Sequence, residues 1–125
     1  MELLDIPQTP STPLIRFEAA SRLLRISGES CPENSFVFYA PVIAWFKVSL
    51  TELYDLTVDI SITYMNSSST KCLFDIIDIM EEAYCRGVTT SIIWRYDSEN
   101  PRSYEMAEEF REEVTFPFEI EAIEE

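Results

Sequence analysis

Apolar and polar residues alternate over two short runs near the start of the chain, at residues 14–17 and 23–26. Two such runs joined by a short polar stretch are typical of a β-hairpin, which we expect to end at Ser27-Gly28. Residues 8–12 are polar and Pro7, Pro10 and Pro13 lie in or beside them, so we expect residues 1–13 to form an extended N-terminal arm ahead of the hairpin.

A helix is predicted next, because apolar residues over 32–50 fall near helical spacing. Asn34 and Ser35 are candidate N-cap residues, since their side chains can accept a hydrogen bond from the first turn. Pro41 lacks a backbone N–H, so we expect it to kink the helix or to restart it.

Residues 56–65 show the clearest strand pattern in the chain, a strict alternation that places Tyr64 on the apolar face and leaves the other face mostly polar. The polar residues 66–70 break this strand. An amphipathic helix is predicted after them, and Gly87 is its expected stop. The apolar stripe of that helix consists of Leu73, Ile76, Ile77, Met80 and Tyr84.

The last third of the chain predicts a strand over 89–96, a helix that begins at Asn100-Pro101, and an edge strand over 116–123. The full order is β-β-α-β-α-β-α-β. Strand–helix–strand connections are right-handed and favour parallel pairing, so the predicted class is α/β. We expect a mixed, mainly parallel sheet, opened by the antiparallel hairpin, with helices mainly on one face. With 125 residues, the chain is expected to form a single domain over 1–125.

Charge and composition exclude several classes of function. The chain has 9 basic and 23 acidic residues, a net charge of −14, which repels phosphate backbones and anionic membranes. We therefore expect neither a nucleic acid nor a membrane as partner. Histidine is absent, which removes His-dependent nucleophiles and His-ligated metal sites. The three cysteines lack paired spacing and no export or membrane segment is evident, so we expect a cytoplasmic protein.

The segment Asn66-Ser67-Ser68-Ser69-Thr70 is the strongest candidate site, because it joins the end of a strand to the start of a helix. Unpaired N–H groups and the helix dipole stabilise a phosphate at such a position. Serine and asparagine are also the preferred capping residues, so capping alone explains the same pattern. No glycine-rich phosphate loop is present, and we predict no cofactor.

Clustered carboxylates offer an alternative from another class. Asp75, Asp78 and Glu82 share one helix face and could bind Mg²⁺ or Ca²⁺ in a small acidic metal-binding enzyme. Charged residues opposite an apolar stripe are ordinarily a solvated face, so we predict no metal and no catalytic residue. Residues 97–125 hold 11 acidic and 2 basic residues, which indicates a surface for a basic protein partner.

The element order and its serine-bearing segment resemble STAS domains, the fold of anti-sigma-factor antagonists. More closely, the sequence resembles the SiaC family of bacterial regulatory phosphoproteins through an ordered set of short matches. These are Ser11-Thr12-Pro13, Gly28 with Ser30, Pro32-Glu33-Asn34-Ser35, Tyr64-Met65-Asn66-Ser67-Ser68-Ser69, Phe74-Asp75-Ile76, Glu81-Glu82-Ala83, Ala107-Glu108-Glu109-Phe110-Arg111-Glu112 and Phe116-Pro117-Phe118.

The resemblance implies a non-enzymatic switch in biofilm regulation and cyclic diguanylate signalling. In the family, a kinase phosphorylates a threonine directly after the asparagine of this segment, and a metal-dependent Ser/Thr phosphatase reverses it. The unphosphorylated form binds and activates a diguanylate cyclase. Transferred to this chain, the acceptor is Ser67, with Ser68 and Ser69 as alternatives, and Asn66 to Ser69 with Lys71 form the partner-binding segment. The alternatives are an anti-sigma-factor-antagonist-type adaptor and an adaptor that is never phosphorylated.

Overall fold

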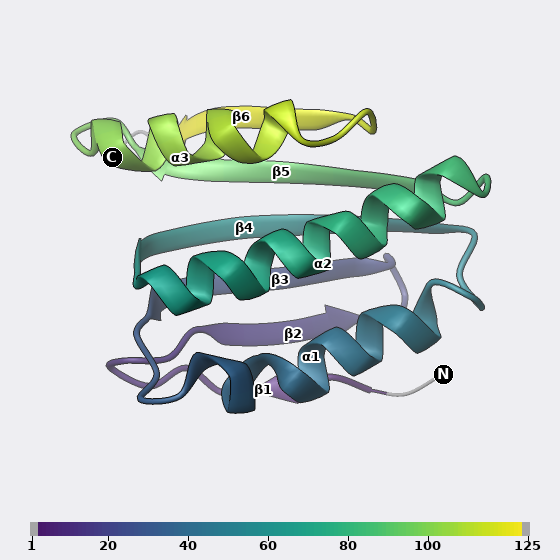
Figure 1. Ribbon diagram of the computed structural model, residues 1–125, viewed down its shortest axis with the longest axis horizontal. Helices are drawn as coiled ribbons and strands as arrows, with labels where there is room; N and C mark the ends of the chain where they lie inside the picture. The colour runs from purple at the N-terminus through teal and green to yellow at the C-terminus, as the bar shows by residue number, and fades with distance from the viewer. Residues whose placement is uncertain (1–2, 124–125) are drawn as a thin grey trace.

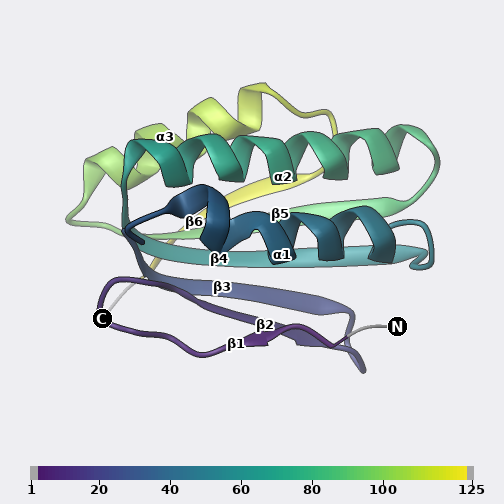
Figure 2. The ribbon, with the colours of Figure 1, turned by 60° about the horizontal axis from the view of Figure 1, so that its bottom comes forward.

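The computed structural model describes residues 3–123, which form one six-stranded sheet with three helices on one of its faces (Figure 1, Figure 2). The strands lie in chain order from β1 to β6; β1 to β3 are antiparallel and β3 to β6 are parallel. Right-handed connections between successive parallel strands place every helix on the same side. The predicted fold class is confirmed, with one additional short strand, β1 (Asp5–Ile6), ahead of the hairpin.

The hairpin consists of β2 (Leu14–Glu18) and β3 (Leu23–Ser30), and β3 continues past the predicted end at Ser27-Gly28. β3 continues because it pairs on its other side with β4 (Asp55–Met65), a long-range partner that the hairpin pattern does not reveal.

A register shift in β4 reverses the facing of its last residues. Gly28 pairs with Ile62, but Glu29 pairs with Tyr64, so Thr63 is an extra residue in β4. Alternation then shifts by one position: Tyr64 is 55% exposed and Met65 is buried. The prediction that Tyr64 shares the buried face was wrong, because strict alternation assumes a strand without a bulge.

Helix α1 (Ser35–Ser49) begins after Asn34, whose side chain accepts a hydrogen bond from the Val37 N–H at 3.1 Å. The helix runs through Pro41 and does not restart there. Pro41 leaves the carbonyl four residues earlier, that of Val37, without its helical donor. Both residues are exposed, so water can satisfy this carbonyl and the helix continues.

The remaining elements are α2 (Ser67–Cys85), β5 (Thr89–Asp97), α3 (Pro101–Glu112) and β6 (Phe118–Ile123), close to the predicted ranges. Gly87 follows α2 with φ +105°, a conformation that favours glycine, as expected for a helix stop. None of the helices in the described part of the chain is long and apolar enough to cross a membrane.

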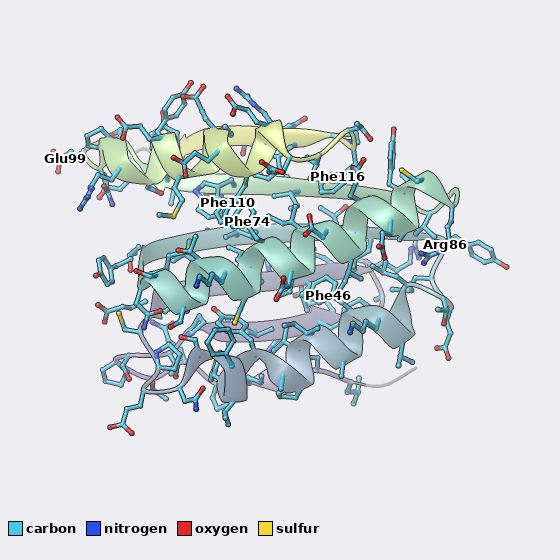
Figure 3. The ribbon with its side chains drawn as sticks, in the orientation of Figure 1. Phe46, Phe74, Arg86, Glu99, Phe110 and Phe116 are labelled. Atoms are coloured by element: carbon cyan, nitrogen blue, oxygen red, sulfur yellow. The ribbon has the colours of Figure 1, made fainter. Side chains whose placement is uncertain are left out.

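The core lies between the helices and the sheet face that they cover, and aromatic residues hold α3 in place. Phe110 of α3 is fully buried, with its ring centroid 4.4 Å from that of Phe74 and 5.4 Å from that of Trp94. Figure 3 shows Phe74 and Phe110 together between α2 and α3. This cluster packs α3 against Phe74 of α2 and Trp94 of β5.

The uncovered sheet face is polar, as predicted from the second face of β4. Asp59, which is 6% exposed, lies between Arg25 at 3.7 Å and Arg95 at 3.1 Å. The row continues on both sides, from Arg25 to Glu18 and from Arg95 to Glu121. Charged cross-strand pairs keep this face compatible with water, so no second layer of helices is needed to cover it.

Candidate functional site

The serine segment was expected to be a loop, but it forms the first turn of α2. Only Asn66 separates the end of β4 from the start of α2 at Ser67. The Asn66 side-chain oxygen accepts a hydrogen bond from the Ser69 N–H at 2.9 Å, so Asn66 is the N-cap. Capping therefore accounts for Asn66, and the serines that follow occupy helical positions.

Burial distinguishes the three serines. Ser67 is exposed, and its hydroxyl makes no side-chain hydrogen bond within the described residues. Ser68 is half-buried and donates to Ser35 Oγ at 2.8 Å and to Asn66 Oδ1 at 3.3 Å. Ser69 is 1% exposed and donates to the Ser30 carbonyl at 3.1 Å. Of these three serines, only Ser67 is exposed.

A network of hydroxyl groups anchors this turn of α2 against β3 and α1. Ser30 Oγ donates to Ser69 Oγ at 2.9 Å and lies 2.6 Å from the Tyr39 hydroxyl. Ser35, the first residue of α1, lies 3.1 Å from Ser69 through their Oγ atoms. Sequence reasoning missed this network, because Ser30 and Ser35 precede Ser69 by more than thirty positions and carry no periodic signal.

Tyr39 is the titratable member of this network. Burial raises its pKa to about 12, against the opposing effect of the hydrogen bonds from Ser30 and Ser69. Burial disfavours the charged phenolate, so the folded protein retains the proton at a pH where the unfolded chain has lost it.

We expect the stability of the protein to fall as the pH rises from about 10 to 12, and Tyr39→Phe to weaken this dependence. Below pH 10, both states hold the proton and Tyr39 contributes no pH dependence. Between about pH 10 and 12, the unfolded state releases the proton while the folded state still holds it. This difference lowers the free energy of unfolding by up to about 3 kcal/mol.

Urea unfolding at about pH 8 and about pH 11 for both proteins measures this difference. At the lower pH, Tyr39→Phe is expected to cost about 1 kcal/mol through its lost hydrogen bond. Equal loss of stability between the two pH values in both proteins would contradict the assignment.

A cavity of about 440 Å³ opens beside Ser67, between the end of β4 and the start of α3. Arg102 is the one basic residue among the described residues that line it, and Glu105 and Glu109 lie on the same helix. Asn100 also lines the cavity and donates to the Thr63 carbonyl at 3.4 Å, which ties the start of α3 to the bulge of β4. Asn100 precedes α3 as predicted, but its side chain does not cap the helix.

The other predicted residues lie on the outer face of α2. Lys71 is exposed one turn after Ser67. Asp75, Asp78 and Glu82 are exposed along the same face. Among the described residues, no group of three or more His, Cys, Asp or Glu side chains is placed to hold a metal ion.

The three cysteines are unpaired. Cys72 is buried, and burial together with the nearby Asp75 raises the pKa of its thiol. It donates to the Ser35 carbonyl at 3.7 Å, so it packs beneath the serine turn as a structural residue.

Comparison with known proteins identifies a family and a relative of this chain. A family model described as SiaC family regulatory phosphoprotein matches residues 6–123. An uncharacterized protein of Pseudomonas aeruginosa strain UCBPP-PA14 is 42% identical over 123 residues, which is 98% of each chain.

Solved structures agree with this relationship. The crystal structure of apo-SiaC from Pseudomonas aeruginosa superposes with a TM-score of 0.92 at 41% identity, over 98% of this chain and 100% of that one. A chain in the crystal structure of the diguanylate cyclase SiaD in complex with its activator SiaC, from the same species, matches with a TM-score of 0.91 at 42% identity, over 96% and 99% of the two chains. The sequence, the fold and the serine turn at the start of α2 thus lead to one conclusion: this chain belongs to the SiaC family of regulatory phosphoproteins.

Proposed function

We propose that this protein is a non-enzymatic, single-domain switch of the cytoplasm whose phosphorylation at Ser67 controls its binding to a diguanylate cyclase. The unphosphorylated form binds and activates the cyclase. A Ser/Thr kinase and a metal-dependent Ser/Thr phosphatase set the modification state. The observation that carries the proposal is the exposure of the Ser67 hydroxyl at the first position of α2, in a chain 42% identical to a cyclase activator.

Access to the hydroxyl favours Ser67 over its neighbours. A kinase has to align a serine oxygen with the γ-phosphate of ATP, so the acceptor hydroxyl must be accessible and free of competing hydrogen bonds. Ser69 would have to abandon its bonds to Ser30 and Ser35 in a buried site. Ser68 would lose two hydrogen bonds, whereas Ser67 loses none within the described chain.

A phosphate on Ser67 changes the site by charge and by hydration. It adds about −1.5 to −2 charges at the start of α2, where free N–H groups stabilise it. It also faces the cavity that Glu105 and Glu109 line, with Arg102 as the nearby cation. A partner that covers Ser67 has to displace water from this dianion and meets more negative charge, so docking is weakened.

Phosphate mapping tests the acceptor. We expect incubation with the cognate kinase and ATP to add one phosphate, located on Ser67 by mass spectrometry, and protein isolated from its host to carry the same modification. Ser67→Ala is expected to abolish labelling and Ser68→Ala to retain it. A phosphate located on any other residue contradicts the assignment. An unmodified protein in the host under all growth conditions would favour the adaptor that is never phosphorylated.

A further inference from the structure

The outer face of α1 is apolar and open to solvent. Val37 is 69% exposed, Phe36 57% and Val48 50%. Together with the exposed small residues between them, these side chains form a continuous band along the helix, which we call the α1 stripe. The α1 stripe consists of Phe36, Val37, Ala40, Pro41, Ala44 and Val48.

This arrangement departs from an ordinary surface helix, which places polar residues opposite its buried side. In α1 the buried side holds Tyr39, Val42 and Phe46, and the outer side contains only Lys47 as a charged residue. Helix α2, which packs beside α1, shows the ordinary pattern, with an apolar inner side and a charged outer side. A contiguous exposed apolar surface of this kind marks a contact for another molecule.

Charge around the α1 stripe identifies the kind of partner. The exposed residues at the two ends of α1 and on the outer face and end of α2 are mainly acidic: Glu33, Glu52, Asp75, Asp78 and Glu82, against Lys47, Lys71 and Arg86. A second copy would bring the same carboxylates and another −14 charges to the contact, so self-association is opposed. A segment with an apolar face and basic flanks complements both the apolar α1 stripe and the acidic residues around it.

The α1 stripe also begins at the serine turn. Ser35, the first residue of α1, accepts a hydrogen bond from Ser68 at 2.8 Å and lies next to Phe36 in the chain. A partner bound to the α1 stripe can therefore also contact the start of α2.

We propose that the α1 stripe is the docking surface for an amphipathic segment with Lys or Arg flanks, contributed by the protein partner that the serine turn regulates. The assignment of that partner as a cyclase rests on the proposed function. The apolar and acidic character of the surface is independent of it. The apolar face of the segment covers Val37, Ala44 and Val48. Its basic residues lie over the carboxylates of α2.

Two charge variants test this surface. Ala44→Glu places a carboxylate in the middle of the stripe at an exposed helix position that tolerates glutamate. Ile123→Glu is the matched control, because Ile123 is also exposed and lies on β6, at the sheet edge opposite to α1. Calorimetry with the diguanylate cyclase of the same organism is expected to show affinity about tenfold weaker for Ala44→Glu and unchanged for Ile123→Glu.

A peptide probe separates this inference from the proposed function. A synthetic amphipathic helix with a leucine face and lysine flanks is expected to shift the amide NMR signals of α1, and Ala44→Glu to abolish these shifts. The same peptide with glutamate flanks is not expected to bind. If the cyclase binds neither the wild type nor Ala44→Glu, the proposed function fails. The peptide result alone then tests whether the α1 stripe is a docking surface.

Three results would overturn the inference. One is equal cyclase affinity for Ala44→Glu and wild type, which would leave the proposed function standing. Another is a lysine-flanked peptide that does not bind or that shifts signals outside α1. The third is a wild-type dimer in light scattering that Ala44→Glu converts to a monomer, which would assign the stripe to a second copy.

Discussion

Replacing Ser67 with aspartate is expected to weaken binding to the cyclase by about tenfold, whereas Ser67→Ala leaves the affinity within about twofold. Ser67 is exposed and its hydroxyl makes no side-chain hydrogen bond within the described residues, so alanine removes little. Aspartate adds a charge that a covering partner has to desolvate. Calorimetric titration of the unphosphorylated proteins with the cyclase measures the difference.

Ser21→Asp provides the charge-matched control. Ser21 is exposed in the turn between β2 and β3, at the end of the sheet away from the serine turn, because Leu23 pairs with the first part of β4. It is expected to bind like wild type. Thermal unfolding should show that the Ser67 variants remain folded, since an exposed first-turn position changes stability by about 0.5 kcal/mol at most. Equal affinities for Ser67→Ala and Ser67→Asp would refute the switch at this residue.

Phe110→Ala is expected to produce the largest loss of stability among these substitutions, about 3 to 5 kcal/mol. The Phe110 ring is fully buried between Phe74 and Trp94. Truncation removes these contacts and leaves a cavity between α2, α3 and β5 that the surrounding rings cannot fill. Equilibrium unfolding in urea measures the change.

Glu105→Ala is the control on the same helix, because Glu105 is exposed and alanine is a good helix former. It is expected to change stability by about 0.5 kcal/mol or less. A cost below about 1 kcal/mol for Phe110→Ala would show that the aromatic cluster does not hold α3. Since α3 forms one wall of the cavity beside Ser67, cyclase binding by Phe110→Ala is expected to fall even where the protein remains folded.

Local patterns predicted most of the fold because each helix and strand carries its own signal. The alternation in β4 and the apolar stripe of α2 depend on neighbouring residues alone, and their ranges agree with the structure within a few positions. The two-residue strand β1 is too short to show a period. The bulge at Thr63 arises from pairing with β3, so the facing of Tyr64 could not be read from β4 by itself.

The sequence alone determined that a serine-rich segment connects a buried strand to a helix, and that an acidic, histidine-free chain carries it. By resemblance it favoured Ser67 as the acceptor and kept Ser68 and Ser69 as alternatives, because the hydroxyl chemistry of all three is the same. Only the tertiary structure distinguished their burial and hydrogen bonding. Ser69 is buried because β3 and α1 bring Ser30 and Ser35 against it, whereas Ser67 faces water beside the start of α3. The exposed apolar side of α1 was decided in the same way, because its all-round apolar pattern does not show which side the sheet and α2 cover.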